Sequence, residues 1–155
     1  MNRIMSLVIG LLLLVMGTAV QGATYGNLEL QKAEVVAVHD GDTLTITLPE
    51  IPKVFGERIG LRLDGIDAPE LNSTCPDLHA RFRERQRAVE ARDFLKRQIE
   101  ISHDLVVVNV GRDKYFRLLG RVFADGVDLS ELMLASGFAK PYDGGKKEGW
   151  CDIPE

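Results

Sequence analysis

The sequence predicts a mainly β protein with packed helices (α+β), in which five short strands form a small barrel. Three observations lead to this prediction. Five segments of strand length are either apolar or alternate apolar with polar residues. One long segment instead repeats its apolar residues at intervals of three or four, as an amphipathic helix does. A chain of 155 residues has the size of one domain and can bury one hydrophobic core.

Each predicted strand has its own signal. The first centres on Val35 and Val36, and in the second, leucine and isoleucine alternate with threonine. In the third, apolar residues alternate with Gly60, Arg62 and Asp64, and the last two are nearly continuous apolar runs. The strands are predicted over residues 28–38, 43–48, 59–64, 105–110 and 118–123, with a loop over residues 49–57 and a turn over residues 124–126.

Two helices are predicted. The longer covers residues 77–101, with apolar positions at Ala88, Ala91, Phe94, Leu95 and Ile99. The shorter covers residues 128–136, begins at a capping Asp128 with Glu131 in a pattern like a capping box, and is stopped by Gly137. Five strands interleaved with two helices are typical of a five-stranded barrel of the oligonucleotide-binding type (OB-fold).

The first 23 residues are predicted to be a secretory signal peptide and not part of the fold. Arg3 gives a short basic start, and residues 7–16 are almost wholly apolar but too short to span a bilayer comfortably. Cleavage is expected near residues 19–23, which leaves a single domain over residues 24–155. An uncleaved N-terminal anchor is the alternative. We expect a periplasmic or secreted protein without stable membrane association after processing.

Two cysteines, Cys75 and Cys151, remain in the mature chain. In an exported protein an even number of cysteines favours a disulfide, here between a loop and the C-terminal tail. Closing a loop of about 76 residues stabilises by roughly 4.5 kcal/mol on the loop-entropy account, if the bond is unstrained. Two free thiols are the alternative. A zinc site is not expected, because the histidines show no metal-ligand spacing with each other or with the cysteines.

The chain is acidic, with a formal net charge of −4 and a pI of about 5.4. Nucleic-acid-binding proteins usually carry a basic footprint, so tight non-specific binding to DNA is not expected. Residues 81–97 hold seven Lys/Arg and only three acids, which predicts a solvated basic face on the long helix. A basic surface is thus compatible with the acidic overall balance.

Acidic residues that suit a hard metal cluster in two segments. Asp40 and Asp42 flank a glycine, and on an extended backbone their carboxylates would face the same way. Asp67 and Glu70 surround a proline that keeps Ala68 out of the helical region, so that the Ala68 carbonyl is free to coordinate. Such oxygens suit calcium or magnesium, with water and phosphate completing the shell. Each motif alone is equally compatible with an ordinary turn.

In order and spacing, these segments resemble the staphylococcal nuclease (thermonuclease) family. The resemblance covers roughly residues 35–140. It rests on residues 38–43 (VHDGDT), 62–70 (RLDGIDAPE) and 113–117 (DKYFR), followed by residues 124–126 (ADG) and 137–140 (GFAK). It implies a five-stranded barrel with packed helices, and calcium-dependent endonuclease cleavage of DNA and/or RNA that leaves 3′-phosphate ends.

The resemblance also implies which acids act. Asp42 and Asp67 would be Ca2+ ligands together with the Ala68 carbonyl, and Asp40 would lie close to the metal, through water. Glu70 matches the residue usually proposed as general base. Ala68 stands where the family commonly has threonine, so a hydroxyl is lost while the carbonyl remains.

On the cationic side, Arg62 and Arg117 match the two arginines that grip the phosphate. Lys114 and Tyr115 match residues that contact the nucleotide's other phosphate. Phe116 stands where glycine is common, and this larger side chain is expected to narrow or redirect the pocket. Two guanidinium groups and a divalent cation would offset the doubly negative transition state of phosphodiester hydrolysis.

The chain departs from the staphylococcal enzyme in its C-terminal region. Residues 142–147 and a short tail replace the long basic helix, and the tail is expected to help close the site, pinned by Cys151. Trp150 is either a base-stacking surface or, as we expect, a residue packed against the barrel. Spacing alone does not choose between Arg117 and Arg121 as the phosphate ligand, whereas the family motif favours Arg117.

Two other function classes compete with the nuclease. Barrels of this type also bind single strands without cutting them, and fold does not fix function. That class predicts loss of the carboxylates and more surface aromatics, whereas the carboxylates are present and aromatics make up only 6% of the chain. An exported phosphodiesterase with other substrates is the third class. We expect a monomeric enzyme that acts on DNA and/or RNA.

Overall fold

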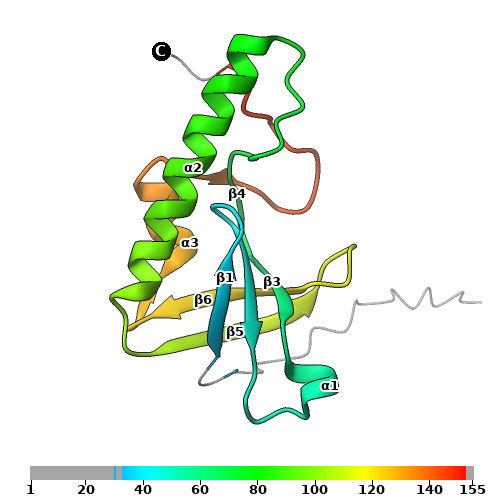
Figure 1. Cartoon of the computed structure of the whole chain (residues 1–155), viewed down its shortest axis with the longest axis vertical. Coiled ribbons are helices and arrows are strands. Elements are labelled where there is room, and N and C mark those ends of the chain that lie inside the picture. Colours follow the sequence, from blue (N-terminus) through cyan, green and yellow to red (C-terminus); the bar gives the residue numbers. More distant parts are fainter. Residues whose placement is uncertain (1–29, 31–32, 153–155) are drawn as a thin grey trace, which may run out of the picture.

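A strongly curled sheet forms the centre of the fold (Figure 1). The computed structural model describes residue 30 and residues 33–152. The strand order is β1-β2-β3-β6-β5, and neighbours are antiparallel except β3 and β6, which are parallel. The strands are β1 (Glu34–Val38), β2 (Thr43–Thr47), β3 (Ile59–Leu63), β5 (Leu105–Arg112) and β6 (Leu118–Ala124).

The sheet curls far enough for its two edges to approach. Leu30, which precedes β1 in the chain, exchanges two backbone hydrogen bonds with Val107 of β5, at 2.8 and 3.1 Å. The predicted α+β fold is confirmed, as a curled half-barrel of five main strands. The predicted strand over residues 28–38 is wrong in extent, because Leu30 pairs with β5 whereas Glu34–Val38 pairs with β2.

Both predicted helices are confirmed. α2 (Leu78–Glu100) packs on β1, and α3 (Leu129–Ala135) packs on β6 and on α2 (Figure 1). The Asp77 carboxylate caps α2 by accepting a hydrogen bond from the Ala80 amide at 2.8 Å, and Asp128 caps α3 in the same way. The φ of +69° at Gly137, in the left-handed region, ends α3 as expected.

Some short elements were not predicted. The expected loop over residues 49–57 contains a one-turn helix, α1 (Lys53–Gly56), which follows Pro52 and is closed by a hydrogen bond from the Gly56 amide to the Pro52 carbonyl at 2.9 Å. Hydrophobic periodicity cannot reveal an element of four residues. For the same reason, the sequence did not predict three two-residue strands, β4 (Ile66–Asp67), β7 (Val127–Asp128) and β8 (Lys140–Pro141).

The core fills the space between the sheet and the two longer helices. Its fully buried residues include Leu44, Ile46, Leu61, Leu63, Val107, Val122, Ala91, Leu95, Leu129 and Met133. Burying each large side chain of this kind stabilises the fold by about 1.5–3 kcal/mol. This packing fixes the start of β2, directly after Asp40 and Asp42. It also fixes the end of β3, which precedes Asp67 and Glu70.

The C-terminal segment returns to the loop that follows β3. β8 pairs with β4 in an antiparallel manner, and the chain after β8 passes beside β4 and the start of α2 (Figure 1). The tertiary structure therefore places the tail beside Asp67, far from it in sequence. Among the described residues, no helix combines the length and the apolar character needed to cross a membrane. The predicted signal peptide, residues 1–23, lies outside the described residues.

Candidate active site

A cleft of about 470 Å³ opens between three parts of the chain. The end of β3 with the loop after it, the turn between β5 and β6, and the C-terminal segment each contribute one side. The predicted site residues that line it are Asp40, Arg62, Glu70, Lys114, Tyr115 and Arg117. Residues from distant parts of the sequence thus meet at one opening.

Asp42, Arg62 and Asp67 form a buried ionic cluster behind this opening, with exposures of 2%, 7% and 3%. The Arg62 guanidinium donates to Asp42 Oδ1 at 2.6 Å and to Asp67 Oδ1 at 3.2 Å. Asp42 also accepts hydrogen bonds from the Thr43 hydroxyl and the Ala68 amide, both at 2.8 Å. Buried charges require such partners, so this cluster is held rigidly.

The predicted extended backbone across Asp40 and Asp42 is wrong, because these residues form a bend. Asp40 Oδ1 accepts a hydrogen bond from the Asp42 amide at 3.0 Å, a pattern that competes with strand formation. Gly41 makes the bend possible, since a Cβ at this position would lie 2.7 Å from Ala68 Cβ and 2.9 Å from Ala91 Cβ. The close approach drives Asp42 into the interior, while Asp40 stays at the cleft.

Negative charge exceeds positive charge in this cluster. Burial, followed by the nearby charge of Asp40, raises the pKa of Asp42 from 3.8 to about 7, although Arg62 opposes the shift. Burial also lowers the pKa of the Arg62 guanidinium, but the carboxylates of Asp42, Asp67 and Asp40 outweigh burial and raise it. Three carboxylates thus share one guanidinium, and a further cation at this place would relieve their repulsion.

Residues of the C-terminal segment cover Asp67. Lys147 Nζ lies 2.7 Å from Asp67 Oδ1 and 2.7 Å from Glu70 Oε1. Trp150 Nε1 donates to the other Asp67 oxygen at 3.3 Å, and Trp150 is 8% exposed. Trp150 is therefore packed against the fold, as expected, and does not offer a free stacking face. Burial lowers the pKa of Lys147, but hydrogen bonds to Asp67 and Glu70 outweigh this effect and raise it.

Arg117, from the turn between β5 and β6, also lines the cleft and is held by Asp113. Arg117 Nε and Nη2 both lie 2.7 Å from Asp113 Oδ2. Burial raises the pKa of Asp113, but hydrogen bonds from the Arg117 side chain, the Arg117 amide and the Tyr115 amide outweigh it and lower that pKa. Gly60 leaves room for the arginine, because a Cβ there would lie 3.2 Å from Arg117 Cγ. The guanidinium is thus aimed by its neighbours while staying accessible from the cleft.

The tip of this turn is exposed. Phe116 has a φ of +67°, a left-handed conformation that costs a residue with a Cβ about 1–2 kcal/mol, and this explains why glycine suits the position. The Phe116 ring lies 4.5 Å from the Arg112 guanidinium and is not among the residues that line the cleft. The expected narrowing of the pocket by Phe116 is therefore wrong, because the backbone directs this ring away. Tyr115 and Lys114 lie at the cleft, the ring 5.5 Å from Arg117 Cζ.

Arg121 points elsewhere. Its Nε donates to Asp128 Oδ2 at 2.8 Å and its Nη2 to Glu131 Oε1 at 3.0 Å, at the start of α3. Glu131 therefore binds Arg121 in place of the predicted capping-box contact. The structure agrees with the expectation that Arg121 forms an ion pair and that Arg117 faces the site.

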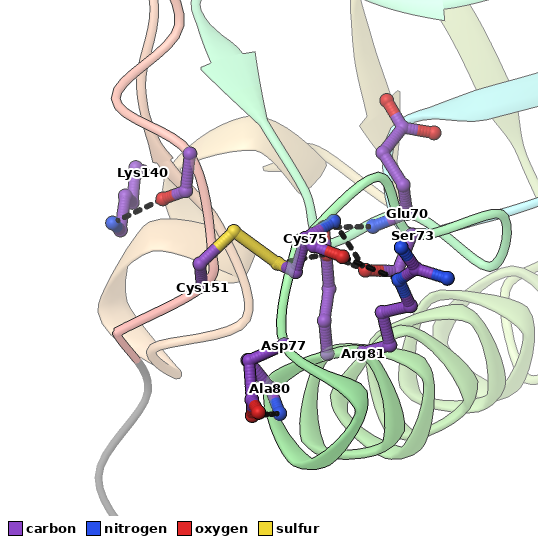
Figure 2. Close-up of a disulfide and its surroundings, with 10 residues drawn as sticks. Glu70, Ser73, Cys75, Asp77, Ala80, Arg81, Lys140 and Cys151 are labelled. Atoms are coloured by element: carbon purple, nitrogen blue, oxygen red, sulfur yellow. Dashed lines mark hydrogen bonds between the residues drawn. A yellow bond between two sulfur atoms is a disulfide. The ribbon is translucent and has the colours of Figure 1, made fainter.

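The predicted disulfide between Cys75 and Cys151 is confirmed, with the two Cα atoms 5.5 Å apart. It joins the loop after Glu70 to the C-terminal tail (Figure 2). Beside it, the buried Glu84 of α2 accepts hydrogen bonds from the Glu70 amide, at 3.2 Å, and from the Ser73 hydroxyl. The loop that carries Glu70 is therefore fixed to α2 by hydrogen bonds and to the tail by a covalent bond.

The oxygen-rich cluster fits a hard divalent cation. Its donors are carboxylate oxygens, which suit calcium or magnesium better than zinc. The ammonium of Lys147 between Asp67 and Glu70 shows that these carboxylates already hold a cation in the described conformation. The carboxylates of Asp42 and Asp67 would hold the ion, with Asp40 beside them. Both oxygens of Asp67 are engaged in the described conformation, so a metal would replace at least one of these contacts.

Three residues of the site carried no predicted role. Asp113 could have been found, because an acid four residues before Arg117 is a common ion-pair spacing. Glu84 was hidden among the charges of the helix, where a solvated face was expected. Lys147 had no signal, since Glu70 lies 77 positions away in sequence.

Comparison with known proteins identifies the family of this chain. The profile described as "Staphylococcal nuclease homologue" matches residues 60–149, more than half of the chain. An uncharacterized protein of Bacillus anthracis is 32% identical over 114 residues, which cover 72% of this chain and 48% of that protein. The chain therefore spans about half the length of this relative. Because the family profile spans the β3 loop, the turn with Arg117 and the C-terminal segment, the chain belongs to the family of staphylococcal nuclease homologues.

Proposed function

We propose that this protein is a calcium-dependent endonuclease that hydrolyses phosphodiester bonds of DNA and/or RNA and leaves 3′-phosphate ends. One observation carries the proposal: two guanidinium groups, Arg62 and Arg117, line one cleft together with the carboxylate of Glu70. Family membership supports a nuclease-like hydrolase, and the oxygen donor set supports calcium.

The residues divide the chemistry between them. Arg117, aimed by Asp113, and Arg62 would bind the phosphate oxygens and stabilise the negative charge that develops there. Glu70, whose side chain is 44% exposed, would take a proton from the attacking water. Lys114 and Tyr115 would contact a neighbouring phosphate of the substrate. A calcium ion held by Asp42, Asp67, Asp40 and the Ala68 carbonyl would supply Lewis acidity at the phosphate.

A zymogram with DNA and with RNA tests the proposal. Clearing should appear in calcium, vanish with chelator and return best with calcium. The products should carry free 5′-hydroxyl groups, which polynucleotide kinase labels without prior phosphatase. Full activity in chelator, or rescue by zinc alone, would contradict the metal assignment. Binding of single strands without cleavage would identify the non-catalytic binding module instead.

We also infer that the protein is exported after removal of residues 1–23, to the periplasm or the medium, where it acts as a monomer. The disulfide between Cys75 and Cys151 supports an oxidising compartment. Mass analysis of the exported protein should place its N-terminus near residues 20–24. An exported protein that retains Met1 would contradict the processing.

A further inference from the structure

The C-terminal strap, defined as residues 142–149, forms one side of the cleft and ends beside the disulfide. Before it, β8 pairs with β4, and after it, Cys151 is bonded to Cys75 (Figure 2). Between these anchors the strap has neither helix nor strand, and three of its eight residues are glycine. Hydrogen bonds hold the two ends of the strap, from the Tyr142 amide to the Gly65 carbonyl and from Lys140 to the Gly149 carbonyl, while its glycines permit backbone conformations that other residues resist.

Lys147 of this strap occupies the place where the proposed metal ligand Asp67 and the proposed base Glu70 face each other. Its ammonium is 2.7 Å from an oxygen of each. The same oxygen of Asp67 accepts from Arg62, and its other oxygen accepts from Trp150. Asp67 is 3% exposed, so an ion that enters from solvent meets it only after this cover has changed.

An ammonium and a divalent cation that bind the same carboxylate oxygens repel each other. Like charges about 4 Å apart near a protein surface repel strongly enough to change an affinity by tenfold or more. Lys147 also engages Glu70, so that its removal would free the carboxylate that the proposed mechanism uses as a base.

From this geometry we propose that Lys147 is a tethered cation that competes with the divalent metal for Asp67 and Glu70, so that metal binding displaces it and lifts the strap. The inference rests on the proposed function, because it concerns the metal of that site. Lys147 would thus help to set the affinity of the site for the metal. The disulfide would keep Lys147 near the site after the metal has displaced it.

The chain offers a matched control in Lys146. This residue is exposed, carries the same charge on the same strap, and is absent from the hydrogen bonds and ion pairs found across residues 33–152. Lys146→Met and Lys147→Met change the net charge equally. A difference between them therefore reports the local contact and not the overall field of the protein.

The test is a calcium titration of the purified, disulfide-bonded protein by calorimetry, without substrate and at one pH. We expect the Kd for calcium to fall about tenfold or more in Lys147→Met and to change less than about threefold in Lys146→Met. In chelator, Lys147→Met should melt at a lower temperature than wild type, because Asp67 and Glu70 lose a counter-ion. Added calcium should raise its melting temperature by more than it raises that of wild type.

Trp150 provides an independent readout. It is the only tryptophan of the chain and contacts Asp67 directly, so its fluorescence should change as calcium binds. Wild-type protein that binds calcium with the same Kd as Lys147→Met would overturn this inference alone. A loss of turnover in Lys147→Met without a change in Kd would also overturn it and make Lys147 a substrate contact. Absence of calcium binding in every variant would refute the proposed metal as well.

Discussion

The two charged sides of the cleft hold their charges in different ways. On the acidic wall, formed by Asp40, Asp42, Asp67 and Glu70, Arg62 pairs with the buried Asp42 and Asp67, and Lys147 bridges Asp67 and Glu70. On the cationic turn, residues 112–117, the side chains are largely exposed and Arg117 is steered by one acid.

Because of this difference, Arg62 has a structural role in the fold, whereas Arg117 remains available to bind a substrate. Arg62 is 7% exposed and sits between two buried carboxylates, so the fold depends on it as much as the proposed chemistry does. The Arg117 side chain is 29% exposed, and its ion-pair partner, Asp113, lies within the same turn, while a longer hydrogen bond of 3.4 Å reaches the Thr43 hydroxyl. Both arginines match phosphate-binding residues of the family. Their removal should nevertheless affect the protein differently, through stability and turnover for Arg62 and mainly through turnover for Arg117.

The largest effect is expected for Arg62→Ala. It leaves Asp42 and Asp67 buried without their shared counter-ion, and breaking a buried pair in this way costs about 3–5 kcal/mol. We expect turnover to collapse and the free energy of unfolding in urea to fall by that amount. Arg62→Ala protein with wild-type stability in chelator would mean that the acidic wall does not depend on this arginine.

For Arg117→Ala we expect a loss of turnover of roughly 10²–10³-fold, because transition-state binding is removed, and a smaller loss of stability than in Arg62→Ala, because the ion pair with Asp113 is partly exposed. Arg117→Lys should remain poor, since an ammonium cannot reproduce a two-pronged contact. Arg121→Ala is the matched control, and should keep most of its turnover while losing some stability through Asp128. Steady-state kinetics beside thermal melts would measure both, and the reverse pattern would assign the phosphate contact to Arg121.

The contributions of the acidic wall and of the cationic turn to stability should also change with pH in opposite directions. Because the pKa of Asp42 is raised from 3.8 to about 7 in the folded protein, the metal-free protein should lose stability as the pH rises from about 4 to 7. Because the pKa of Asp113 is lowered, its contribution is present above pH 4 and is lost as the pH falls below that. Urea unfolding in chelator across this range measures both slopes. Asp42→Asn should remove the first slope and leave the second; persistence of the first slope would assign it to another group.

The smallest effect is expected for Phe116→Gly. Glycine adopts the φ of +67° without strain, which stabilises the folded protein. It also loses the ring contact with Arg112 and gains conformational freedom in the unfolded chain, which both destabilise it. The net change in the free energy of unfolding should therefore be small. Turnover should stay within about twofold, since the ring does not line the cleft. A gain or loss of activity of tenfold or more would show that the ring shapes substrate access.

The sequence alone determined the features that depend on short-range chemistry. Alternation of leucine and isoleucine with threonine located β2, and Asp128 lies where a helix cap was expected, because each signal is contained within a few residues. Two cysteines were enough to predict the disulfide. The motif spacing indicated the family and brought Arg62, Glu70 and Arg117 together in one hypothesis.

Only the tertiary structure decided how the charges are shared. The close approach of Gly41 to Ala68 and Ala91, which needs a residue without a Cβ, joins segments that are far apart in the chain and that no local pattern encodes. Lys147 reaches Asp67 because β8 pairs with β4 and the disulfide holds the tail, so its role depends on contacts between residues far apart in the chain. Local sequence specifies which chemical groups are present, whereas burial and long-range packing decide which of them are already bound and which remain free to act.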